Sequence, residues 1–374
     1  MTRHVTLTER RRKVVRLSRE CAVALRRDFP GVVALSLDAR PGCYEVAAGG
    51  YVGTFVAAGT HVTVRPKYPL TYLDTAAGKD FAQGHGDDIA ATLARRFVRE
   101  FRDLLAVGLL RGYADQALDS PTVRGRLDFA QMMHNPSRLF PIVADEFTLD
   151  HGLNQVPKAA TVALLGCDLP AEVRESLTRV VSALAAVTAV DPAVIRWDDF
   201  RFDARTAHYR PVIETARAVL TGLHSGGTTT TRLFNLAAIF ENELTARLTG
   251  DRIEPQARIV LDGDGPARTL RPDFVVRGPD GGAIAVWDAK WKTLARGGPA
   301  DDDLHQVLAY AAALGVRRCG LIYPGRRTRE YELTTPSGVR VGVGVVTVPV
   351  TGNPRHFDAA VRALKTRFTA GKSA

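Results

Sequence analysis

Residues 270–291 read LRPDFVVRGPDGGAIAVWDAKW, and this stretch decides the fold of the C-terminal part of the chain. Two mainly apolar runs, 270–276 and 283–291, flank the Gly-rich turn segment 277–282. Short runs rich in β-branched and aromatic residues on both sides of such a turn predict two strands paired as a hairpin. We therefore expect a β-sheet that contains this hairpin.

Helical and strand patterns alternate around the hairpin. Apolar residues recur at helical spacing over 232–249, and three aspartates open a predicted helix over 301–314, where they suit the positive end of the helix dipole. Further strands are predicted at 318–323 and 339–350, followed by a basic helix over 356–368. This order predicts an α/β domain in which helices flank a mixed sheet.

Charged side chains interrupt the apolar pattern of the hairpin at Asp273, Asp288 and Lys290. Side chains alternate along a strand, so Asp288 and Lys290 project to one face, and hairpin pairing can bring Asp273 beside them. Trp287 and Trp291 then face the core. A surface hairpin with an exposed Asp–Lys ion pair explains the same residues, but charges in an otherwise apolar strand are costly without partners. The pattern favours two carboxylates and a lysine converging on one spot.

This set of residues suits the hydrolysis of phosphodiesters. The reaction needs a hard cation to neutralise the charge that builds on the phosphate, and carboxylate oxygens are the natural ligands of such a cation. Asp273 and Asp288 are predicted to hold Mg²⁺, with the carbonyl oxygen of Ala289 as a third ligand. Lys290 is predicted to orient or deprotonate the attacking water and to stabilise the developing oxyanion.

Two helical residues are candidate accessories to this site. Glu241 lies at the edge of the buried stripe of the helix before the hairpin, where it can add a carboxylate to the metal shell. Gln306 lies near the start of the following helix, with Tyr310 one turn on, and is predicted to orient a water or contact the phosphate.

The set Asp273 and Asp288-Ala289-Lys290, with Glu241 upstream and Gln306 downstream, resembles the motif of the PD-(D/E)XK nuclease superfamily. More narrowly, the chain is similar to the McrC-like nuclease subunits of McrBC-type, modification-dependent restriction systems. The segments that carry this wider resemblance are Tyr51-Val52-Gly53, Arg65-Pro66-Lys67, Arg124-Gly125-Arg126-Leu127-Asp128-Phe129, Asp150 with Asn154, Phe240-Glu241, Asp288-Ala289-Lys290-Trp291-Lys292, Gln306 through Tyr310, and Leu321-Ile322-Tyr323-Pro324.

The resemblance implies a function that spacing alone does not give. McrC-like proteins work with McrB-like AAA+ GTPases, which form rings and carry the module that recognises modified, double-stranded DNA of the 5-methylcytosine type. The N-terminal part inserts into the ring and stimulates GTP hydrolysis, and the C-terminal part cleaves DNA. Asp273 and Asp288 are then the metal ligands, Lys290 is the catalytic lysine, and Glu241 and Gln306 are accessory. The expected activity is that of a Mg²⁺-dependent DNA endonuclease subunit.

The chain before this domain is predicted to be β-rich over 31–68 and helical over 87–221. Within the helical part, residues 121–158 are predicted to be irregular. A Gly-, Ser- and Thr-rich stretch at 222–231 reads as a linker. We therefore expect an N-terminal motor-docking region over 1–225 and a nuclease domain over 226–374.

The charge of the chain favours polyanionic partners. Its formal net charge is +10, and residues 1–30 alone hold nine basic and three acidic residues. Val14, Leu17, Cys21 and Leu25 recur there at helical spacing, so the segment is predicted to form an amphipathic helix, either a solvated face or a polyanion contact. This segment and the strands over 44–65 are candidates for stimulating the GTPase.

Composition excludes several classes of protein. Hydrophobic residues make up 45% and charged residues 24%, which is ordinary for a globular protein and not for a disordered one. The four cysteines lie far apart, and no apolar run approaches the roughly 20 residues of a membrane span. The start of the chain has no secretory pattern, so a cytoplasmic protein without a membrane partner is expected.

Two other functions fit the same residues. The chain can be an adaptor that stimulates a ring NTPase while its own site is idle, although the intact Asp273, Asp288 and Lys290 argue against this. It can also be a stand-alone PD-(D/E)XK nuclease that needs no motor.

Overall fold

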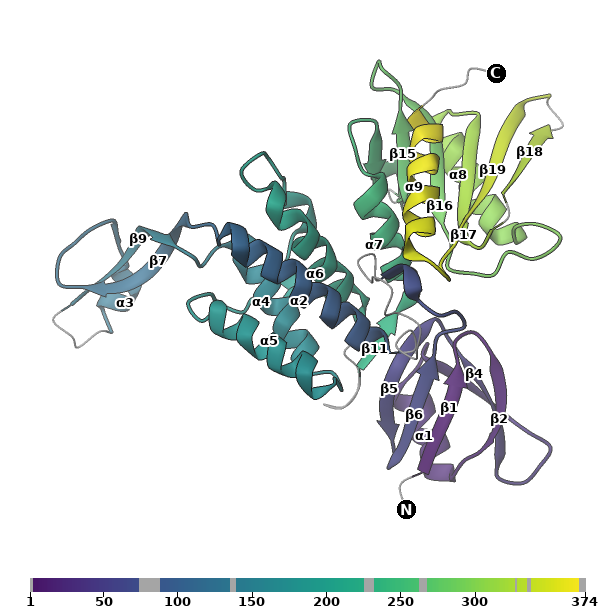
Figure 1. Cartoon of the computed structure of the whole chain (residues 1–374), viewed down its shortest axis with the longest axis horizontal. Helices are drawn as coiled ribbons and strands as arrows, with labels where there is room; N and C mark the ends of the chain where they lie inside the picture. Colours follow the sequence, from purple (N-terminus) through teal and green to yellow (C-terminus); the bar gives the residue numbers. More distant parts are fainter. Residues whose placement is uncertain are drawn as a thin grey trace. The chain divides into compact units, whose positions relative to one another are not determined.

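The computed structural model describes residues 3–73, 88–134, 139–224, 232–261, 268–326, 328–334 and 338–369. The chain divides into two compact units, one formed by 1–92 together with 221–374 and the other by 93–220. The first unit thus draws on both ends of the chain (Figure 1). Most of the predicted linker, residues 225–231, lies outside the described residues.

The N-terminal part of the first unit is β-rich, as predicted for 31–68. A five-stranded sheet has the order β1-β6-β5-β11-β10, with β1 parallel to β6 and the other pairs antiparallel. A three-stranded antiparallel sheet has the order β2-β4-β3. The strands are β1 (Arg3–Thr8), β2 (Arg12–Arg16), β3 (Val33–Leu37), β4 (Cys43–Ala48), β5 (Tyr51–Ala57), β6 (Thr60–Arg65), β10 (Leu223–His224) and β11 (Arg232–Asn235).

The helix predicted from Val14 to Leu25 is wrong over its first part. Residues 12–16 form β2, which pairs with β4, and the helix α1 (Arg19–Asp28) begins only after Ser18, whose hydroxyl accepts from the N–H of Cys21. The apolar spacing fits both structures, and pairing with the distant β4 decides between them. Leu17, Cys21 and Leu25 join one buried cluster with residues of β5 and β6.

The C-terminal sheet is mixed and six-stranded, with the order β12-β15-β16-β17-β19-β18. β15 and β16 pair antiparallel, whereas β16–β17 and β17–β19 pair parallel. This agrees with the predicted α/β arrangement. The strands are β12 (Ile253–Pro255), β15 (Phe274–Arg277), β16 (Ala283–Ala289), β17 (Arg318–Pro324), β18 (Arg329–Thr334) and β19 (Arg340–Val348), and a separate pair is β13 (Ile259–Leu261) with β14 (Arg268–Leu270).

Helices lie on both faces of this sheet (Figure 1). α8 (Asp301–Leu314) packs on β16 and β17, where Val307 shares a buried cluster with Val286. On the other face, Phe368 of α9 (Pro354–Thr369) packs on Trp287 with ring centroids 4.6 Å apart, and α9 also packs on α7 (Leu236–Leu248). Even-numbered residues of β16 therefore face α8, and odd-numbered residues face α9.

Some predicted bounds need correction. The helix predicted to start at residue 232 starts at Leu236, because 232–235 form β11 and Asn235 caps the helix. The strand predicted over 270–276 is interrupted at 271–273, where Pro272 has no N–H to donate to a ladder. β18 was not predicted.

The ring of Trp287 needs glycine on the neighbouring strands. A Cβ built on Gly344 of β19 would lie 2.5 Å from carbon Cη2 of that ring, and one on Gly320 of β17 would also clash with it. Real Cβ atoms do not approach so closely, so glycine at these positions lets the indole lie flat on the sheet.

The second unit is mainly helical, as predicted, but residues 121–158 are not irregular. They contain β8, α3, all of β9 and the first half of α4. The strand β9 pairs with β7 over nine residues, so its partner lies outside the segment. The elements are α2 (Ile89–Val107), β7 (Gly112–Ser120), β8 (Arg126–Leu127), α3 (Phe129–Met132), β9 (Phe140–Thr148), α4 (Gly152–Leu165), α5 (Ala171–Ala183) and α6 (Arg210–Gly222), with short 3-10 helices at Pro192–Val194, Trp197–Asp199 and Ala207–Tyr209. A further 3-10 helix, Thr71–Leu73, belongs to the first unit. No helix of the described residues is long and apolar enough to cross a membrane.

Candidate active site

The hairpin register brings Asp273 and Asp288 together. Phe274 pairs with Trp287, so the residue before β15 lies opposite the residue after Trp287. Oδ2 of Asp273 accepts a hydrogen bond of 2.6 Å from the backbone N–H of Ala289. Both carboxylates are buried, with 8% and 3% of their surface exposed. Asp273 immediately precedes its strand, and the expected convergence of the two acids is confirmed.

Lys290 joins this pair from the end of β16. Its Nζ lies 2.5 Å from Oδ2 of Asp288 and donates to Oε1 of Gln306 at 2.5 Å. Its backbone N–H donates to the carbonyl of Ile322 on β17 at 2.8 Å. Gln306, in the second turn of α8, donates in turn to the hydroxyl of Tyr310 at 2.8 Å. The lysine is thus fixed at its backbone by the sheet and at its ammonium group by Asp288 and α8.

Glu241 reaches the same group through a residue that the sequence did not predict. The side-chain amide of Gln256 donates both to Oε1 of Glu241 and to Oδ1 of Asp273, the latter at 2.8 Å. Gln256 lies just after β12 with φ 51°, a left-handed conformation that is uncommon for residues other than glycine. No periodicity or motif marks it, because its partners come from a helix and a strand distant in sequence.

The electrostatics of the cluster are those of crowded acids. Burial, together with the charges of Glu241 and Asp288, raises the pKa of Asp273 to about 8. Burial also raises the pKa of Asp288, although Lys290 opposes the shift. For Lys290, burial lowers the pKa, but the hydrogen bond and charge of Asp288 outweigh it and the net pKa is raised. The site therefore favours a protonated Asp273 or a bound cation, either of which relieves the repulsion.

A third buried acid lies beside this pair. Asp303, predicted only as a helix-dipole residue, is 4% exposed. Lys292 donates to its Oδ1 at 2.6 Å, and the hydroxyl of Tyr323 donates to its Oδ2 at 2.8 Å. Because Lys292 follows Lys290 by two residues, this pair fixes the chain just beyond the catalytic candidate. The ion pair between Lys292 and Asp303 forms only because α8 packs on the sheet, so no local sequence pattern predicts it.

Two buried carboxylates are a donor set that Mg²⁺ can use. Among the described residues, no group of three or more His, Cys, Asp or Glu side chains is placed to hold a metal ion. Mg²⁺ keeps several waters and usually takes only one or two carboxylates. Asp273 and Asp288 supply two, and the raised pKa of both is the shift that a bound cation reverses. A role for the carbonyl of Ala289 stays a prediction.

Comparison with known proteins gives one family. The model of a family described as "McrBC 5-methylcytosine restriction system component" matches residues 67–324. No curated protein matches the chain. One similar solved structure is a half-complex from a tetradecameric assembly of Thermococcus gammatolerans McrB AAA+ hexamers with bound McrC, at 14% identity and TM-score 0.45, covering 96% of this chain and 100% of that chain. Another is the Thermococcus gammatolerans McrBC complex, at 16% identity and TM-score 0.39, covering 65% and 86%.

Proposed function

The chain belongs to the McrBC 5-methylcytosine restriction system component family, and we propose that within such a system it is the McrC-type subunit that cleaves DNA. The observation that carries this proposal is the convergence of Asp273, Asp288 and Lys290 at one buried spot. All three residues lie inside the matched range, as do Glu241 and Gln306. The target is modified, double-stranded DNA of the 5-methylcytosine type.

In this proposal the residues of the site divide the work of phosphodiester hydrolysis. Asp273 and Asp288 hold Mg²⁺, which when bound supplies positive charge against the scissile phosphate. Lys290 orients the attacking water and stabilises the developing negative charge with its ammonium group. Gln306 keeps that ammonium beside Asp288, and Gln256 bridges the carboxylates of Glu241 and Asp273 by donating to both.

We also propose which region of the chain carries out each function. Residues 226–374 form a PD-(D/E)XK nuclease domain, for which the mixed sheet with helices on both faces is a suitable frame. Residues 1–225 dock on a McrB-like AAA+ GTPase ring and stimulate its GTP hydrolysis. We propose that the complex is cytoplasmic, the compartment in which a restriction system encounters foreign DNA.

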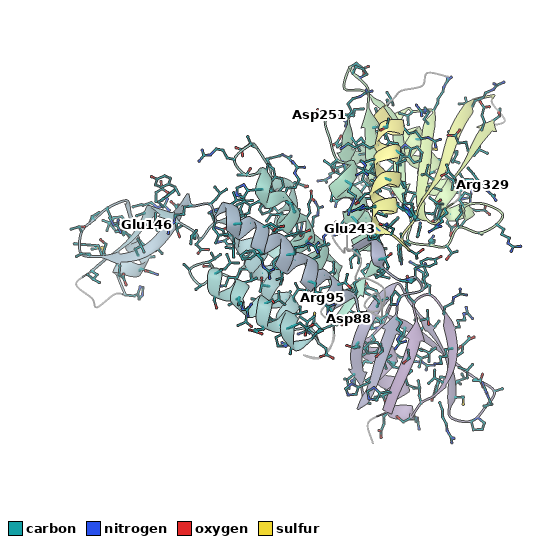
Figure 2. The ribbon with its side chains drawn as sticks, in the orientation of Figure 1. Asp88, Arg95, Glu146, Glu243, Asp251 and Arg329 are labelled. Atoms are coloured by element: carbon teal, nitrogen blue, oxygen red, sulfur yellow. The ribbon has the colours of Figure 1, made fainter. Side chains whose placement is uncertain are left out.

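The hairpin of β7 and β9 is the best candidate for the motor contact. Large apolar side chains are exposed on it and on the segment between its strands: Tyr113, Val123, Phe129, Met132, Met133, Leu139 and Phe147. Figure 2 marks Glu146 on β9 of this hairpin. Exposed apolar groups gathered in this way are typical of protein-binding surfaces. The earlier candidates, residues 1–30 and 44–65, expose fewer large apolar side chains among those described.

Cleavage of methylated plasmid tests the proposal. The chain is assayed with Mg²⁺ alone, then with the McrB-type GTPase of the same system and GTP. We expect cutting only in the full mixture, and loss of cutting in Asp288→Ala. Asp280→Ala is the matched control, because Asp280 lies in the exposed turn of the same hairpin.

The other outcomes select the alternatives. Cutting by the chain alone, without motor or GTP, selects the stand-alone nuclease. Stimulated GTP hydrolysis without any cutting selects the adaptor. Cutting that persists in Asp288→Ala contradicts the assignment of the site.

A further inference from the structure

A buried glutamate from the N-terminal sheet reaches the segment that follows the catalytic candidate. Glu9, just after β1, has none of its surface exposed. Its Oε1 accepts a hydrogen bond of 2.8 Å from the indole Nε1–H of Trp291. The two residues are 282 positions apart in sequence. This contact therefore joins the N-terminal sheet to the residue next to Lys290.

Lys67 and Tyr68, in the segment just after β6, reinforce the contact. Nζ of Lys67 lies 3.9 Å from Oε1 of Glu9, donates to the carbonyl oxygen of Trp291 at 3.4 Å, and lies 5.4 Å from the centroid of the indole ring. The hydroxyl of Tyr68 hydrogen-bonds to that of Thr293 at 2.7 Å. Residues 291–293 are thus held at the indole, at the main chain and at a side chain. We call Glu9, Lys67, Tyr68 and Trp291 the clamp.

The clamp carries a free-energy cost that its contacts must offset. Burial raises the pKa of Glu9 and lowers that of Lys67, so each charged form is disfavoured by its surroundings. An apolar pair would fill the same space without this cost. The charged pair adds a fixed orientation of Trp291. The carboxylate of Glu9 holds its indole N–H, and the ammonium group of Lys67 holds its main-chain carbonyl oxygen.

The orientation of Trp291 bears on the candidate site because Trp291 directly follows Lys290. Its ring packs against Phe240 on α7, with centroids 5.2 Å apart, while the preceding residue, Lys290, points to α8 on the opposite face of the sheet. The backbone N–H of Lys290 is anchored on Ile322, so the clamp acts on the residue just after that anchor. A rotation of the chain at 291 would shift the Lys290 side chain relative to Asp288 and Gln306. Misplacement of a reacting group by about 1 Å can cost about 100-fold in rate.

We infer that Glu9 is a positioning residue for the proposed cleavage reaction: through Trp291 it sets where Lys290 lies relative to Asp288, so the N-terminal sheet completes the nuclease site. This inference rests on the proposed function of Lys290. It assigns to the β-rich part of the chain a second task, distinct from docking on the motor.

Four variants test the inference in the full complex with the McrB-type GTPase, GTP, Mg²⁺ and methylated plasmid. Glu9→Ala removes the acceptor, and Trp291→Phe removes the indole donor but keeps a ring. Glu9→Gln keeps an acceptor oxygen without the charge. Phe55→Leu is the control for general loss of stability. Phe55 is buried under the same sheet, where it packs on Phe29, and its side chain forms no hydrogen bond with the clamp.

We expect Glu9→Ala and Trp291→Phe to lower kcat about tenfold while KM for DNA changes less than twofold. Glu9→Gln should stay within about threefold of the wild-type kcat, and Phe55→Leu should lower Tm without lowering kcat. Wild-type kcat in both Glu9→Ala and Trp291→Phe overturns the inference. A loss of kcat in Phe55→Leu equal to theirs also overturns it, because general destabilisation then explains the effect.

A spectroscopic arm separates this inference from the proposed function. Lysines are methylated with a ¹³C label, and the Lys290 signal is identified by its loss in Lys290→Arg. The Lys290 signal should shift in Glu9→Ala and keep its wild-type position in Glu9→Gln. This result supports positioning even if the wild-type complex does not cleave DNA. An unchanged signal overturns positioning, whereas absence of wild-type cleavage overturns only the proposed function.

Discussion

The side-chain amide of Gln256 donates to Oδ1 of Asp273 at 2.8 Å, and the backbone N–H of Gln256 donates to the carbonyl of the same residue at 2.9 Å. Asp273 precedes its strand and has no ladder partner of its own there, so this double contact fixes both its main chain and its carboxylate. Because the amide also donates to Glu241, it bridges the two carboxylates and offsets part of the repulsion between them.

Gln256→Ala should therefore weaken the site without unfolding the chain. The variant removes the donor of Oδ1 of buried Asp273 and of Oε1 of Glu241, which costs about 1–3 kcal/mol for the buried oxygen, while the backbone contact remains. We expect the cleavage rate at saturating DNA to fall roughly tenfold or more and Tm to change by only a few degrees. Gln256→Asn, with a shorter amide, should behave like the alanine variant. Full activity in both variants would show that the amide does not organise the site.

The raised pKa of Asp273 predicts how stability depends on pH when no divalent cation is present. Its pKa in the folded chain, about 8, lies above its ordinary value near 4. The folded state therefore binds the proton more tightly, and this stabilisation is complete below the ordinary pKa and is lost as pH rises toward 8. In EDTA, Tm should fall from pH 5 to pH 8.5, and Asp273→Asn should flatten the profile.

Excess Mg²⁺ should oppose this loss, because metal and proton compete for the same carboxylates. The rise in Tm on adding Mg²⁺ should be larger at pH 8.5 than at pH 6. Thermal denaturation followed by circular dichroism measures both profiles, with Asp280→Asn as the control for an exposed aspartate in the same hairpin. An equal effect of Mg²⁺ at both pH values would argue against a cation at Asp273.

The sequence predicts the part of the site that one hairpin contains. Asp273, Asp288 and Lys290 lie within 18 consecutive positions of the sequence, and strand alternation plus a turn suffices to bring them together. Gln256 and the clamp were not predicted, because each contact joins residues brought together only by folding. No local period records such contacts.

Contacts between residues distant in sequence also explain the errors in the predicted fold. The spacing of Val14, Leu17, Cys21 and Leu25 fits a helix, yet the first of them lies in β2, since pairing with β4 adds stability that local spacing does not reveal. Local pattern predicts an irregular segment over 121–158 because the partner of β9 lies outside it, in β7. By contrast, the helix over 301–314 agrees with its predicted bounds, as its apolar period and its acidic start are both local.

Gly344→Ala tests the close packing of Trp287 on the C-terminal sheet. The added methyl group would lie 2.5 Å from the indole, and the ring, packed on the other side by Phe368, has no room to move away. We expect a loss of about 2–4 kcal/mol in the free energy of unfolding, measured with urea. Gly297→Ala is the matched control, because nothing lies within 4 Å of its added Cβ, and it should change stability by less than about 0.5 kcal/mol. Similar stability of the two variants would contradict this account.

Tyr113→Ser combined with Phe147→Ser tests the proposed motor contact. The two rings are 5.3 Å apart, and 75% and 55% of their residue surfaces are exposed, so the chain should fold without them. Exposed aromatic residues often supply most of the free energy of a protein interface. We therefore expect binding of the McrB-type GTPase and stimulation of its GTP hydrolysis to fall at least about tenfold, with Tm nearly unchanged. Val194→Ser, another exposed apolar residue of the same unit with 68% of its surface exposed, should leave both measurements at the wild-type level. If the double variant binds and stimulates the GTPase normally, the contact lies elsewhere, and the segments 1–30 and 44–65 become the next to test.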